Sequence, residues 1–233
     1  MKIITSAFAL AAALVAGPAL AASTFYLNDD YDPGACTQAS TSANNFGNTY
    51  VCSKQEAPGN GDELDVKAYA AASGANFAAA NVADWSSGFG VRSVQEGLSA
   101  SDPQHSMDND GTQDLLLFKF DSSIALQQFQ LGWYSTDSDV SILAYTGTGN
   151  AVTALTGSRE DTLLNSGWTL VGHFADNLTN TITFNNSASA ISSSYWIVSA
   201  FSRFGQATPT WTDANDYVKL KMVSGNFTCV NSN

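Results

Sequence analysis

The chain has 233 residues, of which 9 are Lys or Arg and 21 are Asp or Glu, giving a formal net charge of −12 at neutral pH. Proteins bind nucleic acids and anionic lipids through Lys and Arg, so a chain this acidic is not expected to bind either. Its length is sufficient for one large β domain.

The N-terminus has the organisation of a secretory signal peptide. Lys2 precedes an apolar run at residues 3–17, and the small residues that follow predict cleavage after Ala21 or Ala22. The apolar run is shorter than the roughly 20 residues that cross a bilayer, and no later segment of the sequence is long and apolar enough to do so. We therefore expect a mature chain that is secreted, either extracellular or associated with the cell surface, without a transmembrane segment.

Three cysteines follow the signal peptide. Cys36 and Cys52 lie in a polar N-terminal segment and are predicted to form a disulfide in an oxidising compartment. Cys229 is then left over, and three alternatives stay open: it is free, it pairs between chains, or it replaces one member of the predicted pair.

The next elements in the chain are predicted to be strands. Residues 23–62 combine strands with long polar loops, and the stretch ELDVKAYAA from Glu63 alternates apolar and polar residues with a period of two. The Ala-rich stretch at residues 74–85 has the propensity for a short helix, although Gly and Asn interrupt it.

The remaining chain contains a series of short apolar runs separated by Gly, Asn, Ser and Asp. These runs are DLLLFKFD, QFQLGWYS, DVSILAYTG, GWTLVGHF, NTITFNN, SSYWIVSAF and DYVKLKMV. Many short strands without long amphipathic helices predict an all-β fold, a single antiparallel β-sandwich with a jelly-roll-like order. The predicted organisation is a signal peptide (1–21), N-terminal strands and loops (22–62), the sandwich body (63–224) and a polar tail (225–233).

Oxygen-bearing side chains gather in four places along the sequence. These are Asp29/Asp30/Asp32, Asp108/Asn109/Asp110/Asp114, Asp137/Asp139 and Asp213/Asn215/Asp216. Calcium takes six to eight oxygen ligands from such groups, and Asp108, Asn109, Asp114 and Asp216 are the candidate ligands for Ca²⁺. The alternative is that these Asp and Asn residues only stabilise turns.

The sequence contains none of the common catalytic motifs, so we predict no catalytic residue and no organic cofactor. His105 beside Asp108 has the chemistry of a general base, but a single histidine in a polar loop is more typical of a surface residue. Trp211, in the polar stretch TPTWTD, is the candidate for stacking on a sugar ring.

Several motifs in succession resemble one known family. The stretch from Ser101 to Gly147, followed by GWTLVGHF, SSYWIVSAF and NDYVKLKMV, resembles the exosortase-dependent surface proteins of Gram-negative bacteria. The resemblance implies a secreted protein associated with the envelope or matrix, and it implies no reaction or cofactor. Proteins of that family usually end in a PEP-CTERM sorting tail, whereas the last residues here, VSGNFTCVNSN, contain no such motif.

These observations predict a non-catalytic, secreted structural protein of the cell surface or extracellular matrix, stabilised by calcium and associating with itself. The alternative is a carbohydrate-binding module for extracellular polysaccharide, and a secreted hydrolase is the third hypothesis.

Overall fold

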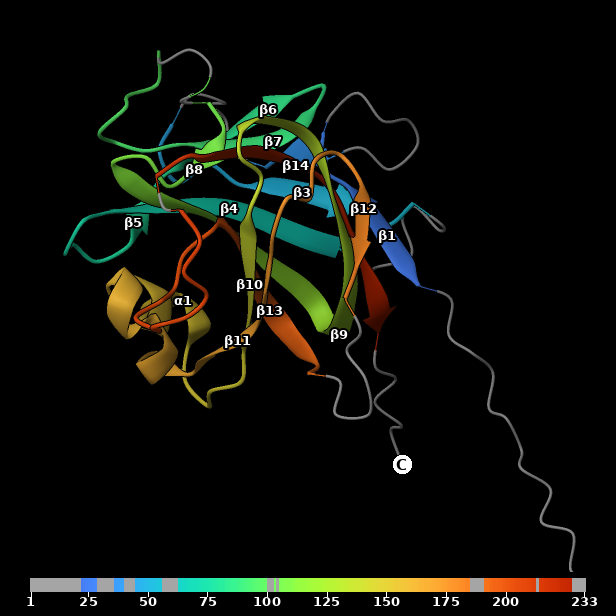
Figure 1. Ribbon diagram of the computed structural model, residues 1–233. Helices are drawn as coiled ribbons and strands as arrows, with labels where there is room; N and C mark the ends of the chain where they lie inside the picture. Colours follow the sequence, from blue (N-terminus) through green and yellow to red (C-terminus); the bar gives the residue numbers. More distant parts are fainter. Residues whose placement is uncertain are drawn as a thin grey trace, which may run out of the picture.

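The structure is a computed structural model in which almost all described residues belong to one all-β body (Figure 1). The described residues are 22–28, 36–39, 45–55, 63–99, 103, 105–184, 191–212 and 214–227. The predicted signal peptide, the first acidic group at residues 29–32, Asp213 and Cys229 lie outside them. Every pair of named strands in the described residues is antiparallel.

The strands form two layers that share a core. One layer has the order β2 (Cys36–Gln38), β3 (Tyr50–Ser53), β4 (Glu63–Ala72), β9 (Thr112–Thr136), β13 (Ser193–Ala200), β10 (Val140–Tyr145) and β11 (Trp168–Phe174), with β5 (Ala78–Ala79) beside β4. The other has the order β12 (Thr181–Thr183), β9, β14 (Asp216–Phe227), β7 (Gly88–Arg92) and β6 (Asn81–Trp85), with β1 (Ser23–Tyr26) and β8 (Met107–Asp108) also on β14.

Strand β9 connects the layers because it belongs to both. Its residues 112–120 pair with β4, whereas its residues 124–136 pair with β14. The exposed residues Asp121 and Ser122 lie between the two parts, where the strand passes from one layer to the other.

The apolar run at the start of β9 is buried on both faces. Leu116, Phe118 and Phe120 point into the core between the layers. Leu115 and Leu117 point the opposite way, into a second core. The two-sided burial explains why this strand shows a continuous apolar run instead of an alternation.

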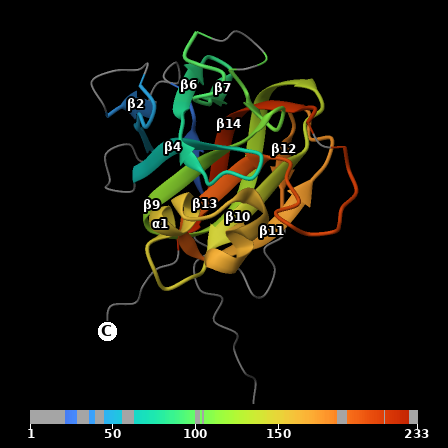
Figure 2. The same cartoon turned by 90° about the vertical axis from the view of Figure 1, so that its left-hand side faces the viewer.

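Two short helices cover the outer face of the first layer, which is the face that carries Leu115 and Leu117. They are α1 (Ala151–Thr156), capped by the Asn150 side chain, and the 3₁₀ helix η1 (Glu160–Ser166). Their buried residues Leu155 and Leu163 complete the second core, and Figure 2 shows α1 lying over β9 and β13.

The prediction of an all-β antiparallel sandwich is confirmed, whereas the jelly-roll-like strand order stays a prediction. The disulfide Cys36–Cys52 is also confirmed and joins the adjacent strands β2 and β3. The helical interpretation of residues 74–85 is wrong, because β5 and β6 form there and Val82 packs in the core between the layers. Among the described residues, no helix combines the length and apolar character needed to cross a membrane.

Candidate metal centre

Three carboxylates from three separate segments meet beside the start of β9. Glu96 lies in the loop after β7, Asp108 ends β8, and Asp114 is the third residue of β9. Each contributes one oxygen, and these three oxygens lie within 4.8 Å of one another. We call Glu96, Asp108 and Asp114 the carboxylate triad; the loop that carries Glu96 is fixed by the backbone N–H of Ser93, which donates to Glu96 Oε2 over 2.8 Å.

The two aspartates of the triad each have one oxygen held by a neighbouring donor, and a side-chain hydrogen bond joins the carboxyl groups of Asp108 and Glu96. The N–H of Asp110 donates to Asp108 Oδ1 over 3.0 Å, and the Thr112 hydroxyl donates to Asp114 Oδ1 over 3.1 Å. The Oδ2 atom of Asp114 is buried and makes no hydrogen bond. Buried polar atoms without a partner are rare in folded proteins, and a bound ion is one of the explanations for those that do occur.

Burial raises the pKa of every carboxyl group in the triad, and repulsion from the other members adds to the rise for the two aspartates. Asp108 is 1% exposed, and burial together with the charge of Glu96 raises its pKa to about 8. Asp114 is fully buried, and burial followed by the charges of Asp108 and Glu96 raises its pKa well above the usual value. Burial likewise raises the pKa of Glu96. The charges that contribute to these shifts belong to other carboxylates, including Asp110.

A second acidic group lies close by, and hydrogen bonds from other residues reach all three of its side chains. Asp137, Asp139 and Asp216 also place one oxygen each within 4.8 Å of the others, and we call them the aspartate cluster. The N–H of Asp139 donates to Asp216 Oδ1 over 2.8 Å, and the N–H of Asp176 donates to Asp139 Oδ1 over 2.7 Å. Asn215 Nδ2 donates to Asp137 Oδ2 over 3.1 Å.

Burial raises the pKa of Asp139 and of Asp216 in this cluster as well. It is the largest cause for Asp139, whose pKa rises to about 6, and for Asp216, whose pKa rises to about 7. Main-chain N–H donors act in the opposite direction because they stabilise the ionised forms.

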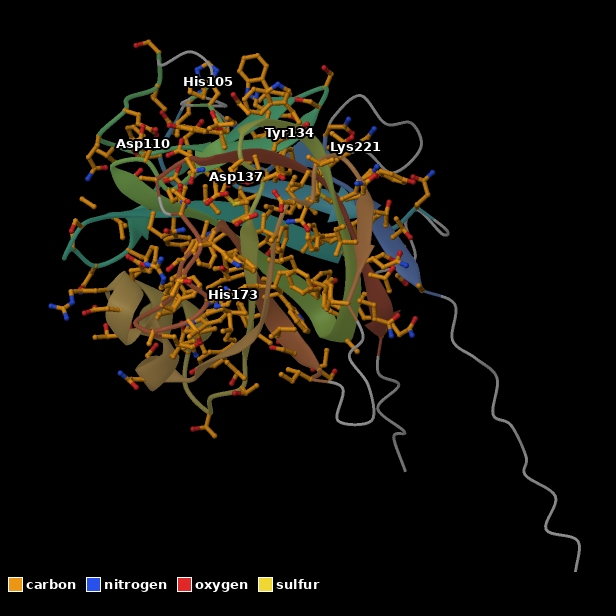
Figure 3. The ribbon with its side chains drawn as sticks, in the orientation of Figure 1. His105, Asp110, Tyr134, Asp137, His173 and Lys221 are labelled. Carbon is orange, nitrogen blue, oxygen red and sulfur yellow. A yellow bond between two sulfur atoms is a disulfide. The ribbon has the colours of Figure 1, made fainter. Side chains whose placement is uncertain are left out.

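Asn109 connects the two acidic groups. Its Nδ2 donates to Asp216 Oδ2 over 2.7 Å, and the N–H of Asp216 donates back to Asn109 Oδ1 over 3.0 Å. Nδ2 also donates to the carbonyl of Phe201 over 3.0 Å. Asp108 belongs to the triad and the next residue, Asn109, is bonded to the aspartate cluster, so these two consecutive residues link the two acidic groups. Figure 3 labels Asp110, beside the triad, and Asp137, in the cluster.

The four residues predicted from sequence therefore do not form a single ligand set. Asp108 and Asp114 belong to the triad, Asp216 belongs to the aspartate cluster, and Asn109 lies between them. Glu96, the third member of the triad, was not among the residues predicted from the sequence. The S-x-x-E pattern that Ser93 begins was a usable signal, because it predicts a turn with the glutamate held in place.

The Trp211 side chain is half-buried and packs in an aromatic group. Its ring centroid lies 5.1 Å from that of Phe201 and 6.2 Å from that of His173. The Arg203 guanidinium donates to the main-chain carbonyls of Pro209 and Trp211 over 2.8 and 2.7 Å, which holds the TPTW segment in place.

A polar pocket of about 250 Å³ adjoins this aromatic group. Phe201 and Arg203 line it together with Asn109, Gln113 and Glu160. The pocket thus lies between the Trp211 aromatic group and the residue that joins the two acidic groups.

The two histidines lie in different places and both contact aromatic rings. His105 stacks on Trp85 with the ring centroids 4.9 Å apart. His173 Nδ1 lies 2.8 Å from the Ser141 hydroxyl oxygen, and burial lowers the pKa of its imidazole.

Comparison of the chain with protein-family models gave no match. Comparisons with curated proteins and with solved structures likewise gave none. The resemblance to exosortase-dependent surface proteins therefore stays a prediction.

Proposed function

We propose that this protein is a secreted structural protein of the cell surface or extracellular matrix that acts without catalysis. The observation that carries the proposal is the aspartate cluster, in which acidic side chains join separate segments of the sandwich. Asp139 receives the N–H of Asp176 after β11, and Asp216 at the start of β14 receives the N–H of Asp139 before β10.

These bonds occupy oxygens that a hydrolase would need for proton transfer. A catalytic carboxyl group must reach a substrate, and Asp139 and Asp216 are 4% and 0% exposed. Raised pKa values are common in active sites, but buried networks that hold a fold together raise them in the same way. We therefore assign the cluster a structural role.

The disulfide supports the proposal that the protein is located outside the cytoplasm. Cys36 and Cys52 face each other on β2 and β3, and disulfides persist in oxidising compartments outside the cytoplasm. We propose that Cys229 is the residue through which chains couple, and that the mature protein associates with itself or with extracellular polysaccharide.

Expression of the full chain in a Gram-negative host tests the compartment. We expect a chain cut after Ala21 or Ala22 outside the cytoplasm, in which Cys36 and Cys52 react with a thiol reagent only after reduction. An uncut cytoplasmic chain with both thiols free would contradict the proposal.

Sedimentation velocity of the mature protein tests association. We expect species larger than a monomer under non-reducing conditions, and a smaller species for Cys229→Ser. A monomer at all concentrations and with added polysaccharide would contradict the structural role. Turnover of a glycan, ester or peptide substrate would contradict the absence of catalysis.

A second candidate function is carbohydrate binding, and the position of Trp211 favours it. The half-exposed indole packs on Phe201, which lines the polar pocket, and sugar sites commonly combine an aromatic face with polar groups. Affinity electrophoresis in polysaccharide gels would show retardation that Trp211→Ala abolishes and that Tyr134→Ala, which removes an exposed aromatic residue elsewhere, preserves. Equal mobility of all three proteins with and without polysaccharide would exclude this function.

A further inference from the structure

We infer that the carboxylate triad of Glu96, Asp108 and Asp114 is a binding site for a hard divalent cation, Ca²⁺ in the first place. The ion would join the loop after β7, the end of β8 and the start of β9. The aspartate cluster, by contrast, is a purely structural network.

The spacing of the triad suits one shared ion. Calcium–oxygen distances are about 2.3–2.6 Å, so two oxygens bound to one ion are at most about 5 Å apart. The three triad oxygens lie within 4.8 Å of one another. They also come from three segments, which is the arrangement in which one ion adds most to tertiary structure.

A buried oxygen without a hydrogen-bond partner, Oδ2 of Asp114, is the second, independent observation. Asp114 is 0% exposed, and its Oδ1 atom accepts a hydrogen bond from the Thr112 hydroxyl. The local bond thus orients the carboxylate and leaves Oδ2 available. A ligand side chain in a metal site needs this arrangement, because it must be oriented and still have a lone pair to offer.

Charge leads to the same conclusion. Three carboxylates in a small volume repel one another, and a buried charge without a partner is among the least stable groups in a protein. In the aspartate cluster, the N–H groups of Asp139 and Asp176 stabilise the buried negative charge by donating hydrogen bonds to it. Around the triad, the charges that act on the carboxyl groups belong to other carboxylates, so a divalent ion is the compensation that fits.

The triad also has room for the further ligands that calcium requires. Glu96 is only half-buried, so solvent reaches its side of the site, and water can complete a shell of six to eight oxygens. Asp110 is on the adjoining turn, where its Oδ2 accepts a hydrogen bond from the Tyr217 hydroxyl over 2.8 Å. It increases the negative potential around the site without belonging to the triad.

The ligand chemistry selects the class of ion. The donors are all carboxylate oxygens, which suit Ca²⁺, Mg²⁺ and Mn²⁺ better than they suit zinc or copper. Calcium tolerates irregular geometry with many ligands, whereas magnesium requires a near-ideal octahedron of short bonds. Calcium sites of extracellular modules have dissociation constants of about 0.1–1 mM, and only this expected range rests on the proposed function.

Calorimetric titration of the cation-stripped mature protein with CaCl₂ tests the inference. We expect one site with a dissociation constant of about 0.1–1 mM, and a melting temperature that is about 5–10 °C higher at a hundredfold excess over that constant. MgCl₂ should bind at least tenfold more weakly.

Asp114→Asn should lose the calcium response, with affinity falling at least tenfold. The amide keeps an oxygen for the Thr112 hydroxyl and places its NH₂ group toward the other carboxylates, so the variant is expected to fold. Asp108→Asn retains its acceptor for the N–H of Asp110 and serves as the second variant. Asp65→Asn removes one surface charge from an ion pair elsewhere and should bind calcium like the wild type.

Two results would overturn the inference: no calcium binding by the wild-type protein, or wild-type affinity in both Asp114→Asn and Asp108→Asn. The second result combined with loss of binding in Asp137→Asn would transfer the site to the aspartate cluster. Because these titrations use purified protein, they fail or succeed independently of secretion and self-association.

Discussion

Without divalent cations, the stability of this protein should fall as the pH rises from 5 to 8. Asp108 has an ordinary pKa near 3.8 when the chain is unfolded, and burial raises the value to about 8 in the folded protein. The folded state therefore binds more protons than the unfolded state between these values. The stabilisation from the protonated carboxyl group is fully present below about pH 4 and is lost as the pH rises toward 8.

The size of the effect follows from that shift. Each pKa unit corresponds to about 1.4 kcal/mol, and nearly three units apply between pH 5 and pH 8, which gives an upper limit of roughly 4 kcal/mol. Solvent reaches the triad beside Glu96 and screens part of this repulsion, so we expect about 2 kcal/mol. In a domain of this size, that corresponds to a fall in melting temperature of about 4–8 °C.

The assay is thermal unfolding of the cation-stripped protein, followed by circular dichroism at intervals between pH 5 and pH 8. Asp108→Asn is the matched control, because it cannot ionise at this position while it keeps the acceptor for the Asp110 N–H. The difference between the two curves removes contributions from groups that do not interact with Asp108, including His173, whose lowered pKa acts in the opposite direction. Parallel curves for the two proteins would refute the raised pKa and the buried repulsion from which we derive it.

Three further predictions concern the disulfide, strand β7 and the second core. Replacing both Cys36 and Cys52 by Ala should lower the free energy of unfolding by about 3 kcal/mol in urea titrations, since the unfolded chain regains the freedom of a closed loop. Gly90→Ala should unfold at a lower temperature and bind calcium more weakly, because the new Cβ would lie 1.8 Å from the main-chain oxygen of His105 in the segment leading to the triad. Leu117→Ala should cost about 2–5 kcal/mol by urea titration, because the side chain is 3% exposed in the second core.

Each of these predictions has a result that contradicts it. A double cysteine variant as stable as the oxidised wild-type protein would mean that the disulfide adds nothing to the fold. Wild-type calcium affinity in Gly90→Ala would show that the loop adapts without disturbing the triad. Lys119→Ala, on the same strand but exposed, is the control for Leu117→Ala, and equal losses in the two would argue against the second core.

The sequence predicted the elements well wherever a period of two or a long apolar run was present. Leu64 and Val66 on β4 pack in the core between the layers, as their alternation indicates. The Ala-rich stretch was misinterpreted because Ala favours helices locally, whereas the pairing of β6 with β7 depends on contacts that propensity does not describe.

The candidate site was only half predictable, for a similar reason. Asp108 and Asp114 are close in sequence, and a turn between them can be predicted from Asn109 and Gly111. Glu96 joins them only because β7 and β8 both pack on β14, and that arrangement is set by the tertiary fold. In the sequence, Asp216 was as good a candidate ligand as Asp108 and Asp114. In the structure, donors from other segments already occupy its oxygens.

The pairing of β1 with β14 brings the first and last described strands together, with Ser23 opposite Gly225. A ribosome synthesises β1 long before β14, so β1 lacks its partner until residues 216–227 have emerged. The second half of β9 must wait for the same strand, β14. Contacts between residues so distant in sequence form slowly. The order of synthesis therefore lets the first layer, whose strands pair without β14, form before the second layer can be completed.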